Sequence, residues 1–133
     1  MKIKVRVWDG EQMISPDYID RDGIAHWKAD SIPRLSDKVM MFTGLLDKNG
    51  KEIYEGDLLR WFDVDTETGE VGNEISEVVF HQGSWSRKVR DLIEPIIDAW
   101  GEDNPDVIET EEIIGNIHES PYLLDPAPEI KTN

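Results

Sequence analysis

The segment "FTGLLDKNGKEIYEGDLL", residues 42–59, places acidic, amide and basic side chains between two apolar runs. Asp47 and Asn49 have the alternate spacing of the first oxygen ligands in a calcium-binding loop. Lys51 stands where the third ligand belongs, so the calcium pattern is broken. A phosphate-binding loop needs Lys followed by Ser or Thr at a helix start, whereas "GKE" here leads into the β-prone "IY". The segment is therefore predicted to form a hairpin and a tight strand entry, without a chemical role.

Turn geometry gives these residues a structural interpretation. Gly50 accepts a positive φ angle and Asn49 tolerates one, as a hairpin loop requires. Gly56 has the backbone freedom for a sharp entry into the next strand, where Asp57 can bond nearby amides. A glycine in a strand, such as Gly115, marks a close approach of a neighbouring group. The predicted structural set is Gly44, Asp47, Asn49, Gly50, Gly56, Asp57, Gly115 and Asn116.

Side chains for catalysis or metal binding are sparse and badly spaced. The three histidines, His26, His81 and His118, are 55 and 37 residues apart, and the chain has no Cys. No Ser lies in a Gly-x-Ser-x-Gly elbow. A pair of carboxylates as acid and base has almost no specificity in a chain with 29 acidic residues. We predict no catalytic residue, no metal and no cofactor, and a protein that is not an enzyme.

The charge is strongly acidic and concentrated at the C-terminal end. The net charge is −15, and the last 43 residues contain 12 acids against Lys131 alone. Such a field repels nucleic acids and anionic lipids, so neither is a predicted partner. The acidic segment is either a solvated face with a loose tail or a surface that docks on a basic partner or imitates nucleic acid. Its candidate contact residues are Glu109, Glu111 and Glu112.

The elements around these residues are mainly extended. Alternation in "IKVRVWD" predicts a half-buried strand, and the Asp-Gly pair at 22–23 predicts a hairpin that returns through "IAHWKA". Further strands are predicted in "VMMFTGLL", "LLRWFDV", "ISEVVFH" and "EEIIGNI", with "DTETGEVGNE" (65–74) as a polar loop tip. One helical pattern covers residues 86–100, and Pro95 within it predicts a kink or a break.

These elements predict a mainly β (β-rich α+β) protein. A small N-terminal β subdomain covers residues 1–38, and a compact SH3-like, barrel-like core covers 39–124 with a short or kinked helical insertion at about 86–100. Residues 125–133 are predicted to be a disordered tail. Most of the five tryptophans are expected in the core. Trp8 lies opposite the apolar face of its strand, and Trp8 and Trp27 are the candidate aromatic interface residues.

Three segments resemble the YopX family of phage and prophage proteins. They are "IKVRVWD" followed by "QMI", "FTGLLDKNGKEIYEGDLL", and "EEIIGNIHESPYLL", which together span most of residues 1–124. The resemblance implies an N-terminal β subdomain, a small barrel-like core and no defined biochemical activity. We expect a phage- or prophage-encoded, non-enzymatic accessory protein in the cytoplasm of the bacterial host, which contacts itself as a homo-oligomer or contacts a host protein. The alternatives are an acidic nucleic-acid mimic and a small barrel that binds nucleic acid through "KIKVR" and "SRKVR".

Overall fold

Antiparallel β-structure dominates the chain, which confirms the predicted mainly β class. The computed structural model describes residues 4–64, 66–69, 71–96, 107–108 and 110–124. No helix within these ranges is long or apolar enough to cross a membrane. The elements in chain order are β1 (Val5–Trp8), β2 (Met13–Ile14), β3 (Tyr18–Ile19), β4 (Ala25–Ala29), β5 (Ile32–Ser36), β6 (Val39–Leu46), β7 (Glu52–Tyr54), β8 (Asp57–Val64), β9 (Val71–His81), β10 (Ser84–Val89), β11 (Leu92–Pro95), β12 (Glu111–Asn116) and the 3-10 turn η1 (Pro121–Leu124).

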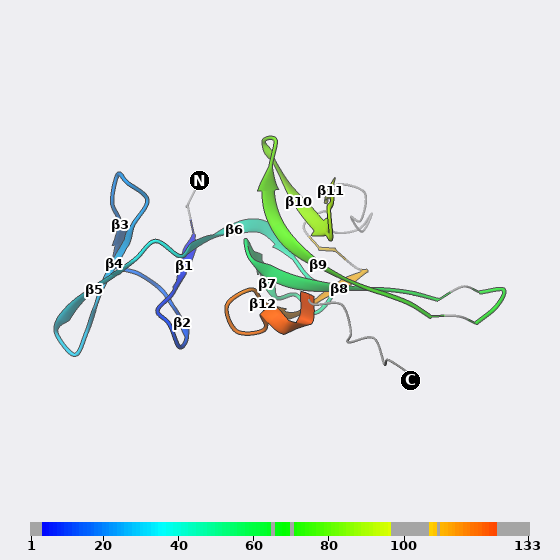
Figure 1. Cartoon of the computed structure of the whole chain (residues 1–133), viewed down its shortest axis with the longest axis horizontal. Helices are drawn as coiled ribbons and strands as arrows, with labels where there is room; N and C mark the ends of the chain where they lie inside the picture. Colours follow the sequence, from blue (N-terminus) through cyan, green and yellow to red (C-terminus); the bar gives the residue numbers. More distant parts are fainter. Residues whose placement is uncertain (1–3, 65, 70, 97–106, 109, 125–133) are drawn as a thin grey trace, which may run out of the picture.

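The strands form three sheets that follow one another along the long axis of the molecule (Figure 1). A three-stranded sheet, β3-β4-β5, lies at one end, and the β8–β9 hairpin projects at the other. Between them, a four-stranded sheet has the order β2-β1-β6-β7, and the largest sheet has the order β11-β10-β9-β8-β12. β1 pairs with β6 across the predicted boundary at residue 38, so the division into subdomains stays a prediction. The predicted tail, 125–133, lies outside the described residues.

The predicted helix at 86–100 is wrong over the residues that the structure describes. They form the β10–β11 hairpin, in which Val89 pairs with Leu92 across a two-residue turn. Arg90 in this turn has a φ of +55°, which a helix excludes. Pro95, at the end of β11, lacks the backbone N–H that a residue inside a helix donates, so it does not favour continuation of a helix. Residues 97–100 of the predicted helix lie outside the described part of the chain.

The predicted loop at 65–74 is also shorter than expected. β9 begins at Val71, and its ladder with β8 continues from Leu58↔Glu77 out to Val64↔Val71. Here backbone pairing extends the hairpin through a polar sequence that composition alone marks as a loop.

The hydrophobic core lies on the inner face of the curled five-stranded sheet. Its buried members are Ile53, Leu59, Val78, Ile96 and Ile108, with Leu45, Trp85 and Ile113 packed against them. Full burial of each such side chain stabilises the fold by about 1.5–3 kcal/mol. Side chains alternate between the two faces of a strand. The residue two positions beyond a core residue on the same strand therefore lies on the same face, outside the hydrophobic core.

Candidate functional site

The Asp47 carboxylate joins the β6–β7 hairpin to β12. Its Oδ1 accepts hydrogen bonds from the backbone N–H groups of Asn49 and Lys51, each at 2.9 Å. Its Oδ2 accepts one from Ile113 N–H at 3.0 Å, although Ile113 is 66 residues away. Gly50, at the loop, has a φ of +80° and donates its N–H to the Asp47 carbonyl. Asp47 is fully buried, and its oxygens serve structural hydrogen bonds.

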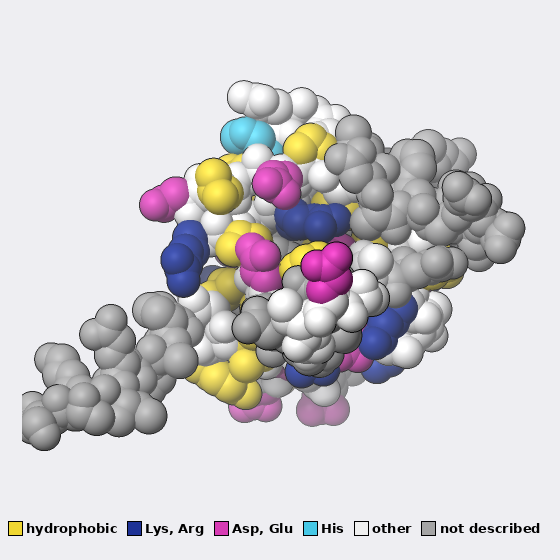
Figure 2. Space-filling model, turned by 90° about the vertical axis from the view of Figure 1, so that its right-hand side faces the viewer, with side chains coloured by type: hydrophobic (Ala, Val, Ile, Leu, Met, Phe, Trp, Pro, Cys, Tyr) yellow, Lys and Arg dark blue, Asp and Glu magenta, His cyan; other side chains and the backbone are white. Residues whose placement is uncertain are grey.

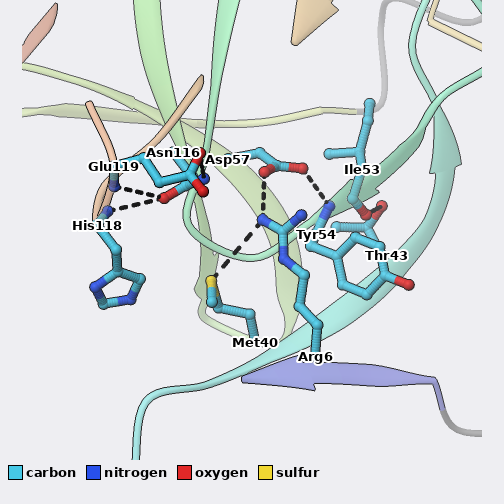
Figure 3. Close-up of polar contacts among 9 residues, drawn as sticks. All are labelled: Arg6, Met40, Thr43, Ile53, Tyr54, Asp57, Asn116, His118 and Glu119. Atoms are coloured by element: carbon cyan, nitrogen blue, oxygen red, sulfur yellow. Dashed lines mark hydrogen bonds and ion pairs between the residues drawn. The ribbon is translucent and has the colours of Figure 1, made fainter. Parts of the chain in front are cut away.

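Asp57, at the start of β8, anchors β1 to the same segment (Figure 3). It accepts a 2.8 Å hydrogen bond from Tyr54 N–H and forms an ion pair with Arg6. The Arg6 guanidinium also lies 4.4 Å from the centre of the Tyr54 ring. Burial raises the pKa of Asp57, while the Tyr54 N–H and Arg6 lower it. Arg6, from the first strand, is therefore enclosed by groups of the hairpin segment.

Three glycines hold positions that a larger residue would disturb. Gly44 has a φ of +86° where the register between β6 and β7 shifts. Gly56 has the same φ, and a Cβ there would lie 3.1 Å from Met40 Sδ. A Cβ at Gly115 would lie 2.7 Å from Ser120 Oγ, in the turn after β12. That turn is closed by Asn116, whose Oδ1 accepts hydrogen bonds from two backbone N–H groups.

The two candidate aromatic residues are half-buried and lie far apart in the topology. The Trp8 ring stacks on His118, with ring centroids 5.7 Å apart and an interplanar angle of 9°. Trp27 lies on β4, opposite Arg34 in the three-stranded sheet. Burial lowers the pKa of His118, with Lys38 and Arg6 acting in the same direction.

The candidate acidic residues do not form one surface. Glu109 lies outside the described residues. Glu112 forms an ion pair with Arg60, whose hydrogen bond lowers the pKa of the Glu112 carboxyl. Glu111 is only 1% exposed and points to the inner face of the sheet, so it is withdrawn from the acidic surface.

The burial of Glu111 reveals a polar pocket in the curled sheet. The pocket has a volume of about 270 Å³, and each of the five strands contributes to its wall. Its lining residues are Trp61 (β8), Glu74 and Ser76 (β9), Arg87 and Val89 (β10), Leu92 and Glu94 (β11), and Glu111 (β12).

The curl of the sheet brings the two sides of this pocket together. Arg87 Nη1 lies 3.2 Å from Glu111 Oε1. β10 and β12 are separated by β9 and β8 in the strand order. In a flat sheet three strand spacings would separate their backbones by about 14 Å. The ion pair therefore depends on the half-barrel, and no local segment could form it.

Buried polar atoms in this pocket have no hydrogen-bond partner among the described residues. They are both carboxylate oxygens of Glu111, the Oγ of Ser76 and the Nε of Arg87. Burial raises the pKa of the Glu111 carboxyl; Arg87 lowers it, and Glu74 raises it further. An unsatisfied buried polar group costs about 1–3 kcal/mol, and more when it is charged. The pocket thus keeps hydrogen-bonding capacity that the fold does not use.

Comparison with known proteins supports both the family and the fold. The YopX protein family model matches residues 4–125. The chain belongs to the YopX family. Members of this family are uncharacterised phage-like proteins. No curated protein sequence matches the chain.

Two solved structures share the YopX fold with this chain. Protein EF1440 from Enterococcus faecalis has a TM-score of 0.59 at 22% identity, over 94% of this chain and 99% of that one. Protein yopX from Bacillus subtilis has a TM-score of 0.58 at 23% identity, over 93% and 97% of the two chains. At 22% and 23% identity, the similarity to these two structures shows a shared fold alone.

Sequence patterns contained part of the signal for the pocket in this YopX protein. Ser76 has the same parity as the buried Val78 in β9, which places a hydroxyl on the core face. Because residues 86–100 were interpreted as a helix, Arg87 was not predicted to lie on the inner face of a sheet. Most tryptophans were expected in the core, whereas Trp61 lines the pocket. Within the described ranges, no three His, Asp or Glu side chains are grouped to hold a metal ion.

Proposed function

We propose that this chain is a phage- or prophage-encoded accessory protein of the bacterial cytoplasm, and that it acts by contacting another protein through the polar pocket. The observation that carries the proposal is the Glu111 carboxylate, which is 1% exposed, forms an ion pair with Arg87 and accepts no hydrogen bond in the described structure. A fold retains such a group at a net cost unless something else satisfies it. A rigid sheet that presents unsatisfied polar groups is suited to binding.

Binding is favoured over catalysis by the placement of the other reactive groups. The Nε2 atom of His26 lies 2.7 Å from Asp20 Oδ2, and its ring stacks on Tyr18 in the three-stranded sheet. His118 stacks on Trp8. Covalent catalysis needs a nucleophile with an adjacent base. Neither of these two histidines lines the pocket, so neither supplies such a base there. These positions support a non-enzymatic role.

The nucleic-acid alternatives have less support. Basic residues of the first half are engaged within the fold, where Lys4 pairs with Glu52 and Arg6 with Asp57. Figure 2 shows acidic and basic side chains interspersed with hydrophobic ones on the face at the β8–β9 end. A decoy for a DNA-binding protein needs a continuous acidic surface, and burial removes Glu111 from it.

A photo-crosslinking amino acid at Leu92 tests the proposal directly. Leu92 lines the pocket and is 68% exposed, so we expect the fold to tolerate the replacement. The matched control is Leu35, which is 65% exposed on β5, away from the pocket. The full-length variants are irradiated in cells of the bacterial host, treated with nuclease and examined by mass spectrometry.

We expect one nuclease-resistant adduct with a host protein from position 92, and none with that protein from position 35. An adduct from position 35 with a second copy of the chain, and none from position 92, would instead assign the contact to self-assembly through the three-stranded sheet. Adducts that nuclease removes would indicate nucleic-acid binding and would overturn the proposal.

A further inference from the structure

The charge of the pocket specifies a cation. Glu74, Glu94 and Glu111 line it against Arg87 alone, which gives a net charge of about −2 when all four are ionised. Phosphate and carboxylate ligands are repelled by such a lining. Because the field is focused between low-dielectric walls, a cation gains more here than on an open acidic surface.

The unpartnered atoms specify a planar cation with several N–H donors. Neither carboxylate oxygen of Glu111 accepts a hydrogen bond in the described structure, although Oε1 forms the ion pair with Arg87. The carboxylate therefore keeps acceptor capacity for the paired N–H groups of a guanidinium. Ser76 Oγ is a further acceptor, and Ser76 is 3% exposed. A guanidinium carries five N–H donors in a fixed plane, whereas an ammonium acts as a more strongly hydrated point charge.

The aromatic wall acts in the same direction. Trp61 lines the pocket and pairs in register with Glu111 on β12 and Glu74 on β9. An indole attracts a cation to its face, and the flat guanidinium of Arg stacks there better than an ammonium. One aromatic residue between two acids gives both the charge and the surface that recognise an arginine head group.

The surroundings favour an arginine within a polypeptide. A larger groove of about 1020 Å³ shares Trp61, Glu74, Val89 and Leu92 with the pocket and continues to Leu124. Leu92 is 68% exposed and Leu124 is 39% exposed along this groove. A free small cation would leave the groove empty, whereas a peptide could follow it with apolar side chains.

We propose that the pocket binds the guanidinium group of an arginine side chain of the partner protein, with Glu111 as its bidentate acceptor and Trp61 as its stacking surface. The inference rests on the proposed function and identifies the chemical group that the partner presents. Arg87 remains at the side of the pocket, where its ion pair with Glu111 Oε1 is shared with the incoming group.

Blocked amino acids test this recognition without knowledge of the partner. N-acetyl-arginine amide is titrated into the full chain at low salt and followed by NMR through the indole N–H signals, with Trp61→Phe to assign the Trp61 signal. N-acetyl-citrulline amide is the neutral, nearly isosteric probe, and N-acetyl-lysine amide tests the charge alone. Variant Glu111→Gln is compared with Glu112→Gln, its neighbour on β12, which pairs with Arg60 on the other face.

We expect saturable millimolar binding of the arginine probe at the Trp61 signal, weaker binding of the lysine probe and none of the citrulline probe. Glu111→Gln should weaken arginine binding by at least about tenfold, whereas Glu112→Gln should change it less than about twofold. Glu74→Gln, at the rim of the pocket, should weaken arginine binding by an intermediate factor. This variant leaves the buried Glu111 site unchanged, so its effect on binding does not depend on the folding of that site.

Equal binding of arginine and citrulline, or no response at the Trp61 signal, would overturn the guanidinium assignment. The proposed function has a separate readout in the crosslink from position 92. A host-protein crosslink that persists in Glu111→Gln would retain the function and reject the arginine recognition. Binding of the arginine probe without any protein crosslink would reject the function and leave a pocket for a free guanidinium compound.

Discussion

Asp47 and Glu111 are both buried carboxylates, with exposed fractions of 0% and 1%, and their hydrogen bonds differ completely. Asp47 accepts three backbone N–H groups from the hairpin loop and from β12. Glu111 has the Arg87 ion pair and no hydrogen-bond donor within the described residues. Burial alone makes the two acids look alike. Their hydrogen bonds distinguish Asp47, which holds the fold together, from Glu111, whose hydrogen-bonding capacity is left for a ligand.

Matched amide substitutions should give the largest difference between the two acids. Asp47→Asn keeps one carbonyl oxygen but turns an NH₂ group toward one of the three backbone donors. We expect it to lower the free energy of unfolding by about 2–4 kcal/mol, because a buried charge-assisted bond is lost and a donor is left unpaired. Glu111→Gln removes the ion pair with Arg87 but also the cost of burying the Glu111 charge, which outweighs the gain from Arg87 in raising the pKa of Glu111. We expect these opposing effects to change the free energy of unfolding by less than about 1 kcal/mol. Urea denaturation at neutral pH measures both.

Equal losses in the two variants would show that Glu111 is structural after all. A neutral effect of Asp47→Asn would mean that the link between the hairpin and β12 is dispensable. Circular dichroism of each variant, before denaturant is added, is the control for a changed fold.

Glycine substitutions sharpen the structural side of the comparison. Gly50 and Gly56 have φ angles of +80° and +86°, so alanine is strained at both positions. A Cβ at Gly50 meets nothing within 4 Å, whereas at Gly56 it lies 3.1 Å from Met40 Sδ and 3.4 Å from Ile117. Gly50→Ala should therefore cost about 1 kcal/mol, and Gly56→Ala about 1–2 kcal/mol more. Thermal unfolding of both variants gives the order, and the reverse order would contradict the packing around Gly56.

Local patterns predicted the hairpin region well because its residues act within a short stretch of chain. Gly50 and Gly56 do have positive φ angles, and Asp57 does accept the Tyr54 N–H. The same patterns could not show that Asp47 also accepts from Ile113, because that bond depends on the tertiary approach of β12. Turn chemistry can be predicted from sequence, whereas the long-range partner of a turn residue cannot.

The pocket was missed for a related physical reason. Its wall comes from five strands, and the Arg87–Glu111 pair exists only because the sheet curls. The apolar residues of the β10–β11 hairpin also happen to follow a helical period, and Pro95 was the one local sign against a helix. With the hairpin interpreted as a helix, Arg87 could not be placed on the core face. Glu111 was then grouped with its half-buried neighbour Glu112 by charge alone.

The smallest expected effect is a difference in pH dependence between these neighbours on β12. Burial raises the pKa of Glu111 above its ordinary value of 4.5, so the folded state binds its proton more tightly than the unfolded state. The stability that Glu111 contributes is therefore present below pH 4.5 and is lost as the pH rises through the raised pKa. The hydrogen bond from Arg60 lowers the pKa of Glu112, so its contribution is present above pH 4.5 and is lost as the pH falls.

The two glutamine variants should consequently diverge from the wild type in opposite directions. Relative to wild type, Glu111→Gln becomes more favourable as the pH rises above 4.5, whereas Glu112→Gln becomes more favourable as the pH falls below 4.5. Differences from wild type are required because Asp57 and Glu77 also have raised pKa values and add slopes of the same sign as Glu111. Melting temperatures of the two variants and the wild type between about pH 3 and pH 7 cover both pH windows and supply these differences. Parallel curves for the two variants would mean that Glu111 is as well solvated as Glu112, and the contrast with Asp47 would then lose its physical basis.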